Sequence, residues 1–107
     1  MSLFNHSEVF RFDEMVTYSN GGVVSKQVMK NEKGNVTLFA FDKGEGLSEH
    51  TAPFDALIQV IDGEALIFIG GNPFNVLAGE SIIMPANISH ALKATKAFKM
   101  ILTMIRA

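Results

Sequence analysis

The chain has 107 residues, a formal net charge of −2 and no cysteine. This length favours a single domain with one core, and the lack of cysteine excludes disulfides, zinc–thiolate sites and thiol nucleophiles. Because the basic residues are scattered and no apolar run approaches the roughly 18 residues of a membrane span, we expect neither a nucleic-acid partner nor a membrane partner.

The first 22 residues mix polar and apolar positions, and their phenylalanines are spaced irregularly. We predict that residues 1–22 form a lead-in segment that packs on the rest of the protein or on a partner subunit, with His6 at the surface. The segment lacks the basic and apolar regions of a secretory signal, and a chain without cysteine fits a reducing compartment. A cytoplasmic location is therefore expected.

From Val23 onward, short β-type runs alternate with turns rich in glycine, asparagine and proline. No stretch keeps a 3.6-residue period for three turns. A series of about nine to eleven short strands, spaced about 8–12 residues apart, is instead typical of an all-β sandwich or barrel. The strands are expected at residues 23–30, 36–42, 47–51, 54–61, 64–69, 74–77, 81–84, 89–94 and 98–105.

The dipeptide Asp62-Gly63 separates two of these runs. An aspartate followed by glycine between apolar strands is a strong signal for a tight turn, because both residues tolerate the backbone angles that such turns require. We therefore predict a β-hairpin in which residues 54–61 and 64–69 are the two arms.

Two segments resemble the sequence motifs of the cupin superfamily. Residues 46–63 hold a glycine, a histidine and a closing glycine as in the first motif, and residues 79–90 read GESIIMPANISH, which is similar to the second. The resemblance implies a small single-domain conserved-barrel protein whose jelly-roll β-barrel, or double-stranded β-helix, covers residues 23–107. It also implies a divalent metal held by three histidines and a glutamate at the mouth of the barrel.

Only part of the family's ligand set is present. His50 matches the first histidine and His90 the last, whereas Ala52 and Ala56 stand where the second histidine and the glutamate belong. Strand alternation places Asp55 on the outer face, but a one-residue bulge beside it would turn its carboxylate inward. Asp55 is therefore a candidate third ligand, next to the metal-ligand candidates His50 and His90.

Two imidazoles hold a divalent metal more weakly than three or four ligands do. The expected cofactor is thus one weakly bound transition metal (Zn, Ni, Fe, Mn or Cu) or none. Alanines at two ligand positions also predict a roomier and more apolar pocket at the barrel mouth. This pocket is expected to be lined by Ala52, Ala56, Met84, Phe98, Met100, Leu102 and Met104.

Three functions compete at this point. The first is a binding module that holds a small molecule, sugar-like or carboxylated, inside the barrel. The second is a metal-dependent enzyme of the dioxygenase, isomerase or decarboxylase type, using His50, His90 and a third ligand. The third is a pure interaction protein. The missing ligands favour the first, and the sequence leaves open whether any catalysis occurs. Because 48% of the residues are hydrophobic, we also expect a homodimer.

Overall fold

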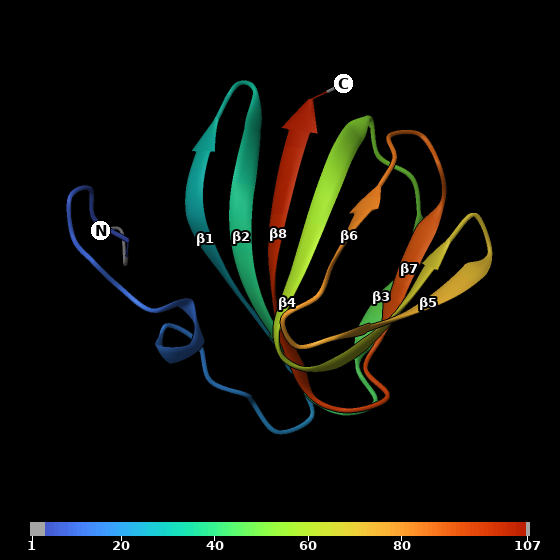
Figure 1. Ribbon diagram of the computed structural model, residues 1–107, viewed down its shortest axis with the longest axis horizontal. Helices are drawn as coiled ribbons and strands as arrows, with labels where there is room; N and C mark the ends of the chain where they lie inside the picture. The colour runs from blue at the N-terminus through green and yellow to red at the C-terminus, as the bar shows by residue number, and fades with distance from the viewer. Residues whose placement is uncertain (1–3, 107) are drawn as a thin grey trace.

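The computed structural model describes residues 4–106 (Figure 1). The described part is almost entirely β-structure, which confirms the expected all-β class. None of its helical segments is long and apolar enough to cross a membrane. The elements are η1 Phe12–Glu14, β1 Val23–Asn31, β2 Gly34–Phe41, β3 Gly46–His50, β4 Phe54–Ile69, β5 Asn72–Leu77, β6 Ser81–Met84, β7 His90–Lys93 and β8 Phe98–Arg106.

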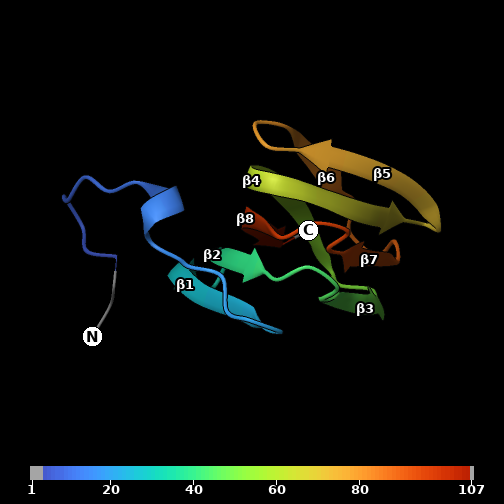
Figure 2. The same cartoon turned by 90° about the horizontal axis from the view of Figure 1, so that it is seen from below.

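The strands form one strongly curled antiparallel sheet, with the order β1-β2-β8-β4-β7-β3 along its main path. Strand β4 is the centre of this arrangement. Its first part pairs with β8 and β6, and its second part pairs with β7 and β5. Figures 1 and 2 show how β4 consequently passes from one wall of a half-barrel to the other. The inward faces of the two walls therefore meet around a common interior.

The predicted hairpin at Asp62-Gly63 is wrong, because β4 runs through this dipeptide as a single strand of 16 residues. The register against β8 shifts between Val60 and Asp62, which marks a bulge. Gly63 has a φ of 74°, and a Cβ at this position would overlap the carbonyl oxygen of Ala97. The two residues therefore bend β4 from one wall to the other, which requires the same backbone freedom as a turn.

The main core fills the interior between the two walls. In β4, Ala56, Ile58 and Val60 point inward and are at most 3% exposed, as the two-residue period of a strand requires. The rings of Phe41 and Phe98 stack in the same cluster with centroids 4.6 Å apart. Ala56 and Phe98, both expected in the pocket, thus lie in this packed core.

A second apolar cluster joins the N-terminal segment to the outer face of the sheet. Figure 2 shows the segment running beside β1 and β2. Phe4 and Val16 of this segment pack there against Leu38, Ala40 and Ile101 of the sheet, and all five residues are buried. The described residues 4–22 therefore contact the barrel. The bounds 1–22 and 23–107 stay a prediction, and residues 1–3 and 107 lie outside the described part.

Side chains of the segment also contact the bend in β4. The hydroxyl of Tyr18 donates a hydrogen bond to the carboxylate of Asp62, and the ammonium of Lys99 lies 5.2 Å from the centre of the Tyr18 ring. Burial, followed by the hydrogen bond and the negative charge of Asp62, raises the pKa of Tyr18 above its ordinary value. The tyrosine thus stays protonated as the donor that ties the segment to the bend.

Candidate functional site

The two histidines matched to the metal-ligand motifs lie side by side. His50 ends β3 and His90 begins β7, and the two residues are register partners across these strands. Their Nε2 atoms are 3.1 Å apart, and their rings meet edge to face with centroids 4.3 Å apart. The fold therefore brings together two imidazoles that are 40 residues apart in the sequence.

The loop between β6 and β7 positions His90. Asn87 in this loop adopts a left-handed conformation with a φ of 65°, which asparagine tolerates better than most residues. Its backbone N–H donates to the carbonyl oxygen of Ala52 at 2.8 Å. The neighbouring N–H of Ala86 donates to Oδ1 of Asp55 at 2.9 Å. These two bonds connect the loop that precedes His90 to the loop and strand that follow His50.

The second of these bonds also defines the place of Asp55. Its side chain is exposed and caps the loop at Ala86, and it is not among the residues that line the histidine cavity. The structure therefore does not bring Asp55 to the two histidines. The register of β4 is regular around Asp55, so no bulge turns this side chain inward. The bulge in β4 lies further along the strand, between Val60 and Asp62.

A cavity of about 190 Å³ opens beside the histidines. Apart from the two imidazoles, all of its lining side chains are apolar. Of the residues expected in the pocket, five line it, whereas Ala56 and Phe98 are not among its lining residues. The lining consists of Leu47, His50, Ala52, Ile58, Met84, His90, Leu92, Met100, Leu102 and Met104.

Sequence reasoning missed three of these residues. Ile58 shares the inward parity of Ala56 in β4, so alternation alone could have included it. Leu47 and Leu92 are register partners in β3 and β7. Their pairing follows from that of the histidines, but only once the bulge between Leu47 and His50 is known.

The environment of His90 favours its neutral form. The residue is 7% exposed, and its Nδ1 lies 3.2 Å from the carbonyl oxygen of Ile88. Burial lowers the pKa of His90, and the neighbouring His50 lowers it further, while the hydrogen bond to Ile88 acts in the opposite direction. At neutral pH the imidazole is therefore available as a hydrogen-bond acceptor or a metal ligand.

This environment predicts that metal-free protein loses stability as the solution becomes acidic. Unfolded His90 takes up a proton near pH 6.5, whereas folded His90 resists protonation to a lower pH. The contribution of His90 to the free energy of unfolding is thus complete above about pH 6.5. It is lost as the pH falls toward the lower pKa of His90 in the folded protein. Urea unfolding between about pH 7.5 and 5 should show this decrease in the wild type and in the exposed-site control His6→Gln. An equally steep decrease in His90→Leu would contradict it.

The geometry of the pair fits adjacent ligands of one metal ion. Two metal–nitrogen bonds of about 2.1 Å place their nitrogens about 3.0 Å apart at a right angle and about 3.4 Å apart at a tetrahedral angle. The observed separation of 3.1 Å lies between these values. However, no group of three or more histidine, cysteine, aspartate or glutamate side chains within residues 4–106 could hold a metal. The described residues therefore fit weak two-nitrogen binding but not a stable four-ligand centre.

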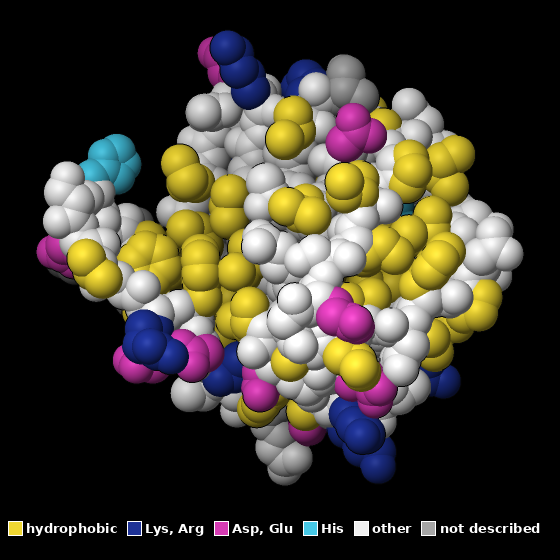
Figure 3. All heavy atoms as spheres, viewed as in Figure 1, with side chains coloured by type: hydrophobic (Ala, Val, Ile, Leu, Met, Phe, Trp, Pro, Cys, Tyr) yellow, Lys and Arg dark blue, Asp and Glu magenta, His cyan; other side chains and the backbone are white. Residues whose placement is uncertain are grey.

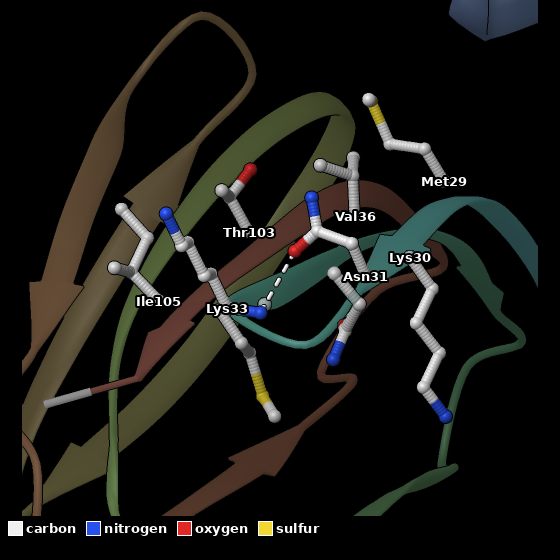
Figure 4. Close-up of a pocket in the computed structure, with 10 residues that line it drawn as sticks. Met29, Lys30, Asn31, Lys33, Val36, Thr103 and Ile105 are labelled. Carbon is white, nitrogen blue, oxygen red and sulfur yellow. Dashed lines mark hydrogen bonds between the residues drawn. The ribbon is translucent and has the colours of Figure 1, made fainter.

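A second hollow, of about 210 Å³, lies where the β1–β2 turn meets the end of β8 (Figure 4). Asn31 orders the turn, since its side-chain oxygen accepts the backbone N–H of Lys33 at 2.8 Å. Lys30 points away from the other labelled side chains in Figure 4. The lining of this hollow contains no histidine and no carboxylate, so it offers no acid–base pair. The histidine cavity is therefore the candidate site.

Comparisons with known proteins agree with the fold and the motifs. Residues 37–106 match the cupin domain family. A conserved protein of unknown function from Streptococcus pyogenes is 32% identical with a TM-score of 0.92, over 100% of this chain and 96% of that chain. A cupin 2 conserved barrel domain protein from Leptotrichia buccalis is 44% identical with a TM-score of 0.89. That match covers 91% of this chain and 47% of the other.

A cupin superfamily protein from Desulfitobacterium hafniense is 21% identical with a TM-score of 0.90, over 97% of this chain and 95% of that chain. At this identity the likeness bears on the fold alone. No curated protein is significantly similar to the chain.

Proposed function

Because the chain belongs to the cupin domain family, we propose that it uses the interior of its jelly-roll barrel to bind a small molecule. The observation that carries this proposal is the cavity of about 190 Å³ with two imidazoles in an otherwise apolar wall. Small-molecule sites have this composition, with few polar groups that orient the ligand and a larger apolar area that binds it. The four methionine and leucine side chains from β6 and β8 also suit an adaptable wall.

The same two imidazoles would hold a divalent cation weakly. Ni²⁺ and Cu²⁺ are the expected occupants, because imidazole suits them and because late transition metals bind nitrogen ligands tightly. When bound, such an ion would supply Lewis-acid character at the histidine end of the cavity. His50 and His90 would supply its two protein ligands, each through Nε2. We therefore treat the metal as an accessory of the pocket and not as a resident catalytic centre.

Elemental analysis of protein purified without nickel-affinity resin tests this function. We expect metal well below one equivalent per chain, and binding of cavity-sized probes that survives chelator treatment. Near-stoichiometric metal that is lost in both His50→Ala and His90→Ala would instead establish a metal-dependent enzyme as the better description. Protein that binds no probe in the cavity, with or without metal, would contradict the binding module.

The location of the bound molecule can be tested by filling the cavity. Ala52 lines it, so Ala52→Phe should abolish probe binding by occupying the space. Ala78, which is exposed in the turn after β5, provides the matched control Ala78→Phe, which should bind like the wild type. Equal binding by both variants would place the ligand elsewhere.

We also propose a homodimer that covers the outer face of the β8–β4–β6 wall. On this face Leu57, Ile83, Thr103 and Ile105 border a hollow of about 210 Å³, and Ile83 and Ile105 are 64% and 60% exposed. Figure 3 shows hydrophobic side chains across much of this face, with lysine and arginine toward its edge. Exposed apolar patches of this kind mark interfaces, and a second copy of the chain is the proposed partner.

Sedimentation should accordingly give a mass of about twice the 11.7 kDa of one chain. Ile83→Lys and Ile105→Lys should each shift the mass toward the monomer, because a lysine at the centre of the interface would be buried without a partner. Ile88, which is 42% exposed in the loop before β7, provides the control Ile88→Lys. A wild-type mass near that of one chain would refute the dimer.

A further inference from the structure

A second cavity lies between the N-terminal segment and the outer face of the sheet, away from the histidine pair. Its volume is about 350 Å³, which lies within the roughly 300–1,000 Å³ of small-molecule sites. Phe10 and Phe12 of the segment line one side, and Val36 of β2 and Ile101 of β8 line the other. Figure 3 shows hydrophobic side chains where the segment meets the barrel. Because both sides belong to one chain, this outer cavity is a cleft and not a bare face of the sheet.

Two polar side chains interrupt the apolar sheet side of the outer cavity. Gln59 of β4 is the register partner of Ile101 in β8, and Thr103 follows two residues later on the same face of β8. Both side chains line the cavity and are half-buried. Within residues 4–106, neither makes a side-chain hydrogen bond. The outer cavity therefore presents an amide and a hydroxyl whose hydrogen-bonding groups have no protein partner.

The chemistry of the lining defines the ligand that it fits. A glutamine amide has two donor hydrogens and an acceptor oxygen, so a primary carboxamide pairs with Gln59 through two hydrogen bonds, one in each direction. The described lining contains no carboxylate, lysine or arginine side chain, and its imidazole, that of His6, is exposed. A charged ligand would therefore lose its water without gaining a buried ion partner, which is costly.

The aromatic side of the outer cavity favours a ring in the ligand. The rings of Phe10 and Phe12 meet edge to face with centroids 5.0 Å apart, an arrangement that a further aromatic ring extends. An apolar cavity of about 150 Å³ holds benzene, so the outer cavity of about 350 Å³ has room for a ring that carries a carboxamide group.

We propose that the outer cavity binds a neutral aromatic carboxamide, whose amide pairs with Gln59 and whose ring packs against Phe10 and Phe12. This site is separate from the histidine cavity, so the inference goes beyond the function proposed above. Thr103 also borders the hollow of the proposed dimer face, which makes a second copy of the chain the competing occupant. The small molecule is favoured because the apolar side chains of that face, such as Ile83, would leave the Gln59 amide without a partner.

NMR titration of ¹⁵N-labelled, chelator-treated protein with three probes tests the ligand class. Benzamide carries the carboxamide, benzoate replaces it with a charge, and toluene lacks both. At about pH 7.5 we expect benzamide to bind about tenfold more tightly than benzoate or toluene, as net hydrogen bonding to one amide allows. Benzamide should also shift the side-chain amide signal of Gln59, which is identified by its loss in Gln59→Leu.

Three variants locate the bound benzamide. Gln59→Leu should lower its affinity about tenfold, to that of toluene. Gln27, which is exposed on β1, gives the matched control Gln27→Leu, which should bind benzamide like the wild type. Ala52→Phe fills the histidine cavity only, so it should also leave benzamide binding unchanged.

The contrary outcomes are distinct from one another. Toluene or benzoate binding as tight as that of benzamide, or unchanged affinity in Gln59→Leu, would overturn the inference. Benzamide binding that is lost in Ala52→Phe would assign the probe to the histidine cavity, which would overturn the inference and leave the binding module standing. Binding by the Ile83→Lys monomer but not by the wild type would show that a second copy occupies the outer cavity. Binding by neither would refute the carboxamide site.

Discussion

Ala52→His is expected to raise the affinity of the site for Ni²⁺ or Zn²⁺ about 100-fold, which corresponds to about 2.7 kcal/mol. Ala52 lines the same cavity as His50 and His90, so a third imidazole at this position would join two nitrogens that already have the spacing of adjacent ligands. Three histidines with an open position form a familiar divalent-metal site. The new side chain leaves the hydrogen bond from Asn87 intact, because that bond ends on the backbone oxygen of Ala52.

Titration of chelator-treated protein with either metal would measure the gain. Ala78→His is the matched control, because Ala78 lies exposed in a turn and its imidazole would act alone. If Ala78→His gained as much affinity as Ala52→His, the effect would be adventitious surface binding. If neither variant gained, the histidine pair would not be preorganised for a metal, and the weak-site proposal would fail.

Gly63→Ala is expected to destabilise the protein by about 4 kcal/mol or more, enough to leave much of it unfolded. Two effects combine at this position. The φ of 74° strains any residue with a Cβ, and the Cβ would overlap the backbone oxygen of Ala97. Because that atom belongs to the backbone next to β8, it cannot move aside without breaking the pairing of Gly63 with Phe98.

Gly79→Ala separates the two effects. Gly79 also has a left-handed backbone, with a φ of 91°, but no atom lies within 4 Å of a Cβ built there. The control should therefore lose only the conformational part, about 1–2 kcal/mol. Urea unfolding monitored by circular dichroism would give both values. Equal losses in the two variants would show that the contact with Ala97 contributes nothing and that β4 does not bend as tightly as described.

The strands could be predicted from local signals, whereas the histidine pair was expected from the resemblance of two distant segments to the cupin motifs. Glycine and proline mark the turns, and the motif around His90 contains its own turn residues. The error at Asp62-Gly63 has a physical cause. A glycine with positive φ serves equally in a tight turn and in a bulge, and only the pairing of β4 with β8 and β6 on one side and with β5 and β7 on the other distinguishes them.

The lining of the site was harder to predict than the identity of its two histidines. Strand alternation tells which face a residue occupies, but it does not tell how deep in the barrel that residue lies. Phe98 is on the inner face, yet it lies in the packed core, whereas Leu102 and Met104 on the same face of β8 border the cavity. Ala56 lies at the level of its register partners Met84 and Met104, which line the cavity, but is not itself a lining residue. The depth depends on register between strands that are distant in the sequence, and register follows from bulges that the sequence does not mark.

The continuity of β4 has a consequence for how the molecule opens. Because a single backbone of 16 residues is paired with β8 and β6 in one wall and with β7 and β5 in the other, unfolding of either wall leaves half of β4 without its hydrogen-bond partners. Local opening that frees amides in one wall should therefore be rare compared with unfolding of the whole domain. In native-state hydrogen exchange, the amides of β4 on both sides of the bend should report one shared opening free energy, close to that of global unfolding. A ligand would then enter between side chains at the histidine end, while the barrel stays closed.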